Sequence, residues 1–224
     1  GVPYHGDKKN IQPGYWKFKN VDGSEDNQIT ESDKTIIGNA LPDFYGGINN
    51  TFNWKDFDLS IFFTYSYGAE VLNATKLTNT KTALTNKNVL SVADEAHRWV
   101  TINANGELIT NPEELAAVNR GKTIAHFGDN GSNNTYIHSW AIEDASYLKL
   151  SNITLGYTFP KKVINKIGLT KLRLYATGNN LFTWTPYTGF DPEVSTMSSA
   201  LTPGVDFGAY PRSRSFVFGV NVAF

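Results

Sequence analysis

The sequence has no cysteine, a single methionine and no long apolar run among its 224 residues. The absence of cysteine excludes disulfides, thiolate metal sites and cysteine nucleophiles. A membrane-spanning helix needs roughly 20 consecutive apolar residues, and no segment approaches that length. The sequence therefore excludes a membrane helix, but it does not exclude membrane-spanning β-strands, which are shorter and alternate in polarity.

Excess charge of either sign is also missing. The 20 basic and 21 acidic residues give a formal net charge of −1, and no run of Lys or Arg could follow a phosphate backbone. Nucleic acid is therefore not expected as a partner. Aromatic residues and glycine are plentiful, with 14 Phe, 11 Tyr, 5 Trp and 19 Gly, and this composition favours strands over helices.

The clearest strand pattern lies at the end of the chain, from Ser215 to Phe224. Its length matches the roughly 9 to 11 residues of a transmembrane β-strand. One face is apolar throughout, and the other is small or polar. We predict that the apolar row faces lipid and belongs to the strand that closes a barrel. The row consists of Phe216, Phe218, Val220, Val222 and Phe224.

Four further segments alternate in the same way. They are residues 44–54, 57–66, 147–159 and 172–179. Lys55 and Asp56 join the first two as a tight hairpin. The apolar phase slips at Ser151-Asn152, which indicates a β-bulge. Phe62 is out of pattern, and Arg173 is predicted to point into a wet lumen.

The links between these segments alternate in length. Residues 55–56 and about 160–169 form short links, whereas about 67–143 and 181–213 are long. Outer-membrane barrels have short periplasmic turns and long extracellular loops. The pattern therefore places both long links outside the cell, together with residues 1–43. Two helical pieces are expected in the first long link, at 89–100 and after Asn111-Pro112.

The predicted fold class is all-β: an antiparallel transmembrane β-barrel, of which this chain is a C-terminal segment. Residues 1–43 would form an extracellular loop region, and residues 44–224 would carry the barrel strands. Five strands cannot close a bacterial barrel, because an open edge in lipid leaves backbone groups unpaired. The remaining strands are expected upstream in a longer protein.

Several segments, in this order, resemble the SusC/RagA family of TonB-linked outer-membrane proteins of Bacteroidetes. The segments are Ile36-Ile37-Gly38-Asn39 with Pro42-Asp43-Phe44-Tyr45-Gly46-Gly47, Ala145-Ser146-Tyr147-Leu148-Lys149-Leu150 with Asn152-Ile153-Thr154-Leu155-Gly156-Tyr157, Asn179-Asn180-Leu181-Phe182, Tyr187-Thr188-Gly189-Phe190-Asp191-Pro192-Glu193, and Tyr210-Pro211-Arg212-Ser213-Arg214. The resemblance implies a 22-stranded barrel with an N-terminal plug. It further implies import of glycans or peptides driven by TonB, with a SusD-like surface lipoprotein as partner. The plug and the TonB-contacting segment are not in this chain.

An acidic segment has the spacing of an EF-hand calcium loop, with oxygen side chains at ligand positions. The candidate calcium ligands are Asp22, Ser24, Asp26, Gln28, Thr30 and Asp33. Asn27 replaces the usual glycine at position 6, and Asp33 is shorter than the usual glutamate at position 12. A solvated acidic loop held by Asx-turns is the alternative interpretation.

No residues indicate an enzyme. The four histidines lack a metal-binding spacing, and Asp191 and Glu193, on either side of Pro192, are interpreted as structural loop residues. Aromatics near both strand ends predict two membrane-interface girdles. They are Trp54, Phe57, Tyr157 and Phe159 at the short-turn end and Tyr65, Tyr67 and Tyr147 at the long-loop end.

The rival interpretation is a soluble, secreted β-sandwich that binds glycans. Exposed aromatics such as Trp99, Trp140, Trp184 and Tyr187 would suit sugar stacking, but loop packing explains them equally. A sandwich would bury the row from Phe216 to Phe224 in a protein core, whereas a barrel would leave it facing lipid.

Overall fold

A computed structural model describes residues 4–5, 13–80, 88–126, 136–196 and 201–224. The chain forms two compact units. The first comprises residues 1–37 and 73–141, and the second comprises residues 38–72 and 142–224. The sequence predicts an N-terminal loop region that ends at residue 43, and the first unit combines most of that region with residues 73–141 of the first long link.

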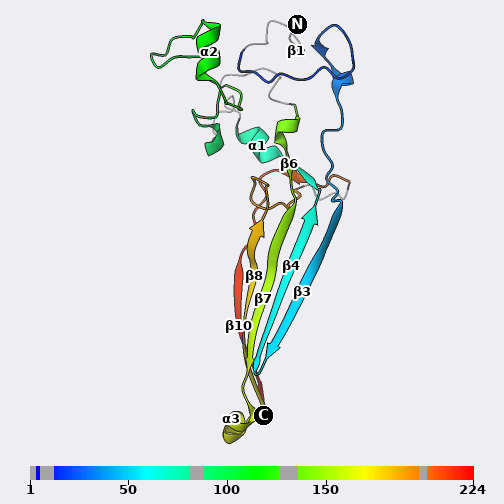
Figure 1. Ribbon diagram of the computed structural model, residues 1–224, viewed down its shortest axis with the longest axis vertical. Helices are drawn as coiled ribbons and strands as arrows, with labels where there is room; N and C mark the ends of the chain where they lie inside the picture. Colours follow the sequence, from blue (N-terminus) through cyan, green and yellow to red (C-terminus); the bar gives the residue numbers. More distant parts are fainter. Residues whose placement is uncertain (1–3, 6–12, 81–87, 127–135, 197–200) are drawn as a thin grey trace. The chain divides into compact units, whose positions relative to one another are not determined.

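A five-stranded antiparallel sheet dominates the second unit. Its strands are β3 (Phe44–Trp54), β4 (Phe57–Tyr67), β7 (Tyr147–Thr158), β8 (Lys171–Trp184) and β10 (Ser215–Ala223). They lie side by side in the order β10-β8-β7-β4-β3 (Figure 1). Within this sheet, strands that follow one another along the chain are also hydrogen-bonded neighbours. All five predicted strands are confirmed, and β8 runs further than expected.

The short links lie at one end of this sheet. Lys55 has a φ of 54° in the two-residue turn between β3 and β4, a positive value that primed hairpin turns require. Between β7 and β8 the chain forms the short helices α3 (Lys161–Ile164) and η6 (Asn165–Ile167). Thr170 fastens this link to the chain end, since its backbone N–H donates to Ala223 and its hydroxyl donates to Phe224.

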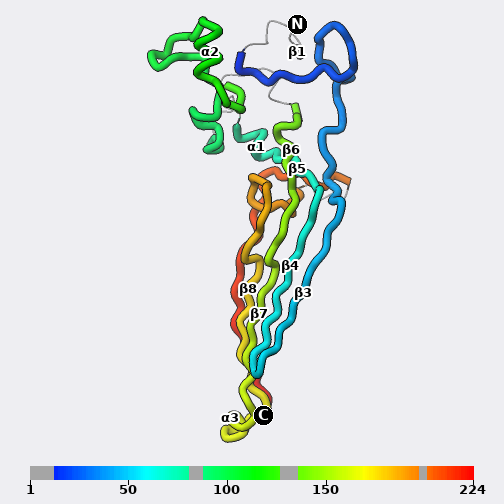
Figure 2. The backbone as a smooth tube through the Cα atoms, viewed as in Figure 1, coloured from blue at the N-terminus to red at the C-terminus, as the bar shows by residue number. Residues whose placement is uncertain are grey.

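A three-stranded sheet lies at the long-loop end of the five strands (Figure 2). It has the order β6-β5-β9 and consists of β6 (Ile142–Asp144), β5 (Glu70–Asn73) and β9 (Val205–Asp206). Val71, Ala145 and Tyr187 form a small buried core beside it. The hydroxyl of Tyr187 donates to Asp206 at 2.6 Å, so this core also contains a satisfied polar contact.

The predicted bulge in β7 is confirmed. Asn152 pairs with Phe62 of β4 and Leu150 pairs with Phe63, which leaves Ser151 as the extra residue. Because successive side chains of a strand alternate between faces, one extra residue restores the apolar set to the same face on both sides of the slip. On the β8 side, Asn180 and Leu181 together lie opposite Ser151, so β8 carries one extra residue relative to β7 at the same level.

The first unit consists of short elements. They are β1 (Tyr4–His5), β2 (Gln28–Ile29), η2 (Glu31–Asp33), α1 (Ala74–Asn79), η3 (Ser91–Ala93), α2 (Pro112–Val118) and η5 (Ser139–Ala141). The expected helix after Asn111-Pro112 is confirmed as α2, whose first amides are capped by the Asn111 side chain. No helix in the described ranges is long and apolar enough to cross a membrane.

The helix predicted at 89–100 is wrong, because only the single turn η3 forms there. The carboxylate of Asp94 accepts hydrogen bonds from the backbone N–H groups of Ala96 and His97. A side chain that takes these amides competes with helical hydrogen bonding. The carbonyl of His97 then accepts from Thr123 and Ile124, so the chain leaves the helical path.

Candidate functional site

The five strands place all their apolar rows on one face of the sheet. Directly opposite residues share a face, and one such row runs Phe218, Ala176, Leu155, Leu59, Phe52 across every strand. Phe218 is 80% exposed and Phe52 57%. The predicted lipid-facing row of β10 belongs to this face, and in the structure all five of its members are exposed, with Phe224 reaching 90%. A contiguous apolar surface of this kind requires an apolar neighbour.

The opposite face is polar along the same strands. A parallel row runs Val217, Thr177, Thr154, Ser60, Thr51, again across all five strands. Its hydroxyl and amide groups bond across strands: Thr154 to Thr177 at 2.8 Å and, one level away, Asn152 to Asn179 at 2.8 Å. A face with such cross-strand polar contacts is suited to water or a polar solute.

Arg173 lies on this polar face, as the alternation predicts. Its Nε and Nη2 donate to the two carboxylate oxygens of Asp58 on β4, at 3.1 and 2.5 Å. Gly156 on the intervening β7 makes room for the pair, because a Cβ there would collide with both side chains. A glycine also makes room for Phe62, the residue out of pattern: its ring lies on the polar face against Gly47 of β3.

Aromatic residues gather at both ends of the apolar face. At the short-turn end, Phe57 contacts Trp54 at 6.3 Å and Tyr157 at 4.7 Å between ring centroids. At the long-loop end, Phe44 stacks on Tyr67 at 5.1 Å. The placement of Tyr147 in this girdle is wrong: Tyr147 pairs with Ser66 on the polar face and donates its hydroxyl to Glu193.

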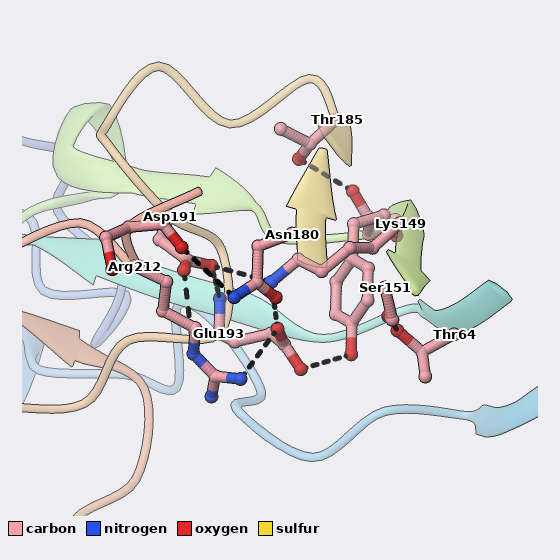
Figure 3. A network of polar contacts seen from close by, with 11 residues as sticks. Thr64, Lys149, Ser151, Asn180, Thr185, Asp191, Glu193 and Arg212 are labelled. Atoms are coloured by element: carbon pink, nitrogen blue, oxygen red, sulfur yellow. Dashed lines mark hydrogen bonds and ion pairs between the residues drawn. The ribbon is translucent and has the colours of Figure 1, made fainter. Parts of the chain in front are cut away.

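Tyr147 belongs to a charge cluster on the polar face, shown in Figure 3. Its centre is Lys149 of β7, whose side chain is only 3% exposed. The ammonium group donates to a carboxylate oxygen of Glu193 and lies 3.5 Å from Asp191. Arg212 adds a second cation, 3.8 Å from Asp191 and 3.6 Å from Glu193. We call these five residues the Lys149 cluster.

The cluster keeps Glu193 ionised. Burial opposes the charged form, but the hydrogen bonds from Lys149 and Tyr147 outweigh it, so the pKa of Glu193 lies below its ordinary value of 4.5. A carboxylate with a depressed pKa contributes stability that is fully present above its unfolded-state pKa and is lost as the pH falls through the folded-state value.

Glu193→Gln should therefore lower the thermal midpoint of the folded protein at neutral pH but not in acid. The difference between wild type and variant is expected to be constant above about pH 4.5 and to shrink below it. Melting both proteins in detergent across this pH range measures the effect. A difference that stays constant down to the lowest pH at which the protein folds would contradict this assignment.

The geometry clarifies the remaining candidates from the sequence. Asp191 and Glu193 form ion pairs with the side chains of Lys149 and Arg212, which agrees with their interpretation as structural residues. Among the outer aromatics, Tyr187 is buried and Trp140 packs at 5.2 Å against Trp16. Trp184 lies in β8, stacked on Phe182. Sequence reasoning missed Lys149, whose one signal is a charged side chain on the polar face of an otherwise alternating strand.

The acidic loop in the first unit is closed by hydrogen bonds from its own backbone. Asp33 accepts from the backbone N–H groups of Val21 and Asp22 through one oxygen and of Thr30 through the other. The amides of Thr30 and Val21 hold the pKa of Asp33 below its ordinary value. Asn27 adopts the left-handed conformation, with a φ of 58°, as position 6 of a calcium loop requires.

The carboxylates of this loop do not form a ready calcium cage. Within the described ranges, no three His, Cys, Asp or Glu side chains are grouped so as to hold a metal ion. Asp22 and Asp26 each accept a nearby backbone amide, from Ser24 and Gln28. Calcium ligation by the six predicted residues would require Asp33 to exchange its amide contacts, and it stays a prediction.

Asp33→Ala should loosen this loop, because three backbone amides lose their acceptor. We expect faster proteolytic cleavage within residues 22–33 of the full-length protein than in the matched variant Glu25→Ala. The same assay checks the prediction of calcium binding. Bound calcium would slow the cleavage and a chelator would reverse this, whereas identical rates with and without calcium would exclude the site.

Comparisons with known proteins agree with this geometry. No family model matches the chain. The chain is 34% identical over 217 residues to TonB-dependent receptor P3 of Formosa agariphila, which covers 95% of this chain and 19% of the relative. It is 29% identical over 206 residues to TonB-dependent receptor SusC of Bacteroides thetaiotaomicron, covering 91% of this chain and 17% of that protein.

The fold matches solved structures as well. A structure of the RagAB peptide transporter superimposes with a TM-score of 0.66 and 23% identity, over 88% of this chain and 19% of the matched chain. A second RagAB structure, in an open-open state, gives a TM-score of 0.63. The five-stranded sheet is thus part of a larger barrel, as the unpaired edges of β3 and β10 among the described strands require. The chain is a segment of a TonB-dependent receptor of the SusC/RagA family.

Proposed function

We propose that this chain forms the C-terminal strands of an outer-membrane transporter that imports glycans or peptides in a TonB-dependent manner. Its apolar face would contact lipid, and its polar face would line the path of the solute. The chemistry of the chain is then binding and passage rather than bond breaking. TonB would act through an upstream region of the full-length protein.

One observation carries the proposal: the separation of an apolar and a polar face over all five strands. Transmembrane barrels have this arrangement because one face meets lipid and the other meets water. The aromatic residues at both ends of the apolar face support it, since Trp and Tyr favour the membrane interfaces. The alternation of short and long links supports the orientation in which the turns at Lys55 and α3 are periplasmic.

The relatives support the class of solute and partner. RagAB is a peptide transporter, and the SusC relative is a TonB-dependent receptor. We infer a SusD-like surface lipoprotein as the partner of the full-length protein. Its contact surface would be formed by the regions expected outside the cell, residues 1–43 and the two long links.

The test is heat-modifiable gel mobility of the full-length protein in outer-membrane extracts. A closed membrane barrel resists detergent until it is boiled, so we expect a faster-migrating band in unboiled samples of the membrane fraction. A protein that is released in soluble form and shows no mobility shift would overturn the proposal. That result would favour the soluble glycan-binding β-sandwich.

The sandwich has weaker support. It needs a second sheet or other protein core over the row from Phe216 to Phe224, and these five side chains are all exposed in the structure. Exposure of Phe182 and Trp184 on the same face also suits lipid better than a packed core.

A further inference from the structure

We propose that the connection between β8 and β10 folds inward over the polar face and covers it at the long-loop end, held there by the Lys149 cluster. The inference concerns the described residues 185–196 and 201–214. It rests on the proposed function, because it takes the polar face as the lining of the solute path. On that basis the connection narrows the path and limits access to the polar face from outside.

The strand register shows which face of the sheet the connection crosses. Lys149 lies directly opposite Thr64 on β4 and Thr183 on β8, and all three belong to the polar face. Lys149 is nearly fully buried, although it lies on a face that the strands leave open. What buries it is the connection, because its partners Asp191, Glu193 and Arg212 all lie there. The connection therefore crosses the polar face and not the apolar one.

Further bonds hold both ends of the connection. At its start, the hydroxyl of Thr185 donates to the carbonyl of Ser146 at 2.8 Å, and the hydroxyl of Thr188 donates to Glu143 at 2.6 Å. At its end, the side-chain amide of Asn180 donates to the carbonyl of Ser213 at 3.2 Å.

Tyr187 adds an internal bond within the connection. Burial and the carboxylate of Asp206 hold the pKa of Tyr187 above its ordinary value, so its hydroxyl stays protonated and donates to Asp206. The two halves of the connection are thereby joined to each other as well as to the sheet.

Within the Lys149 cluster, Lys149 contributes most to holding the connection against the sheet. Two carboxylates of the connection face one buried cation of the sheet, and the second cation, Arg212, is itself part of the connection. Among the described residues, Lys149 is the strand residue whose positive charge contacts these two carboxylates. In Lys149→Glu, repulsion between the new carboxylate and the carboxylates of the buried Asp191 and the half-buried Glu193 would favour release of the connection.

The test is the rate at which a thiol placed beneath the connection is labelled, measured on the full-length protein in intact outer membranes. In the variant Thr64→Cys, the new thiol lies directly opposite Lys149 and is expected to react slowly with a membrane-impermeant thiol reagent added from outside. Adding Lys149→Glu should raise the labelling rate several-fold. The double variant Lys149→Glu with Glu193→Lys, in which the two charges are exchanged, should restore slow labelling. If Lys149 only supported the fold, exchanging the charges would not restore it.

Lys171→Glu is the matched control, because Lys171 lies on the same polar face at the other end of β8. Adding Lys171→Glu should leave the labelling rate of Thr64→Cys unchanged. If Lys149→Glu fails to form the heat-resistant barrel, the milder Glu193→Gln takes its place and should also speed labelling. Equal rates in wild type and cluster variants, or no rescue by the swap, would overturn the inference. A wild type without heat-modifiable mobility would instead overturn the proposed function.

Discussion

Phe218→Arg should strongly reduce the amount of full-length protein that reaches a heat-resistant form in the outer membrane. Phe218 is central in β10 and begins an apolar row that continues across all five strands. A lipid-facing Arg costs about 2–4 kcal/mol near the bilayer midplane. That is a large share of the roughly 5–15 kcal/mol by which a folded protein is typically stable.

The neighbouring residue provides the control for this experiment. Val217 lies in the same strand but on the polar face, opposite Thr177, and is exposed like Phe218. Val217→Arg should assemble nearly as well as wild type, because the new charge faces water. Unboiled gels of membrane fractions give the folded share of each variant. Equal losses for both variants would show that the two faces of β10 are not distinguished by lipid.

Lys149→Met should destabilise the folded protein by roughly 3–5 kcal/mol, the usual cost of removing one partner from a buried ion pair. Two carboxylates, Asp191 and Glu193, would lose their buried cation, which leaves Glu193 with the hydrogen bond from the Tyr147 hydroxyl and the longer ion pair with the exposed Arg212. Unfolding by denaturant in detergent, followed by the aromatic fluorescence of the sheet, measures the loss.

Arg212→Met is the matched variant for Lys149→Met. Arg212 faces the same two carboxylates, but its side chain is 57% exposed and its nitrogens lie 3.6 and 3.8 Å from them. Exposed pairs of this kind contribute about 0–1 kcal/mol. Similar losses for the two variants would contradict the view that burial makes Lys149 decisive.

The strands could be predicted from the sequence because apolar and polar side chains alternate along each of them, which gives each strand one apolar face and one polar face. The alternation of Phe216, Phe218 and Val220 determines both the strand and its orientation, and the phase slip at Ser151 identifies the bulge. The position of Tyr147 at a strand end predicts a place in the girdle, whereas its alternation with Leu148 predicts the polar face. The structure follows the alternation.

The loops could not be predicted in the same way, because their order depends on contacts between distant residues. Asp191 and Glu193 lie in a segment without periodicity, more than 40 residues from Lys149 along the chain. The segment at 89–100 has a helical pattern, but the side chain of Asp94 takes the amides that a helix would need. Local polarity therefore predicts strands well and predicts the partners of a buried charge poorly.

The start of β10 sets the position of the connection relative to the sheet. Ser215, the first residue of β10, pairs with Asn179, next to the bulge where Asn180 and Leu181 lie opposite Ser151 of β7. Beyond that level, β8 continues beside β7 without β10, and the chain is free to cross to the polar face. A one-residue slip in strand pairing reverses the face of every side chain that follows. The register of β10 on β8 therefore decides at which level of the sheet the connection ends and which face its last residues approach.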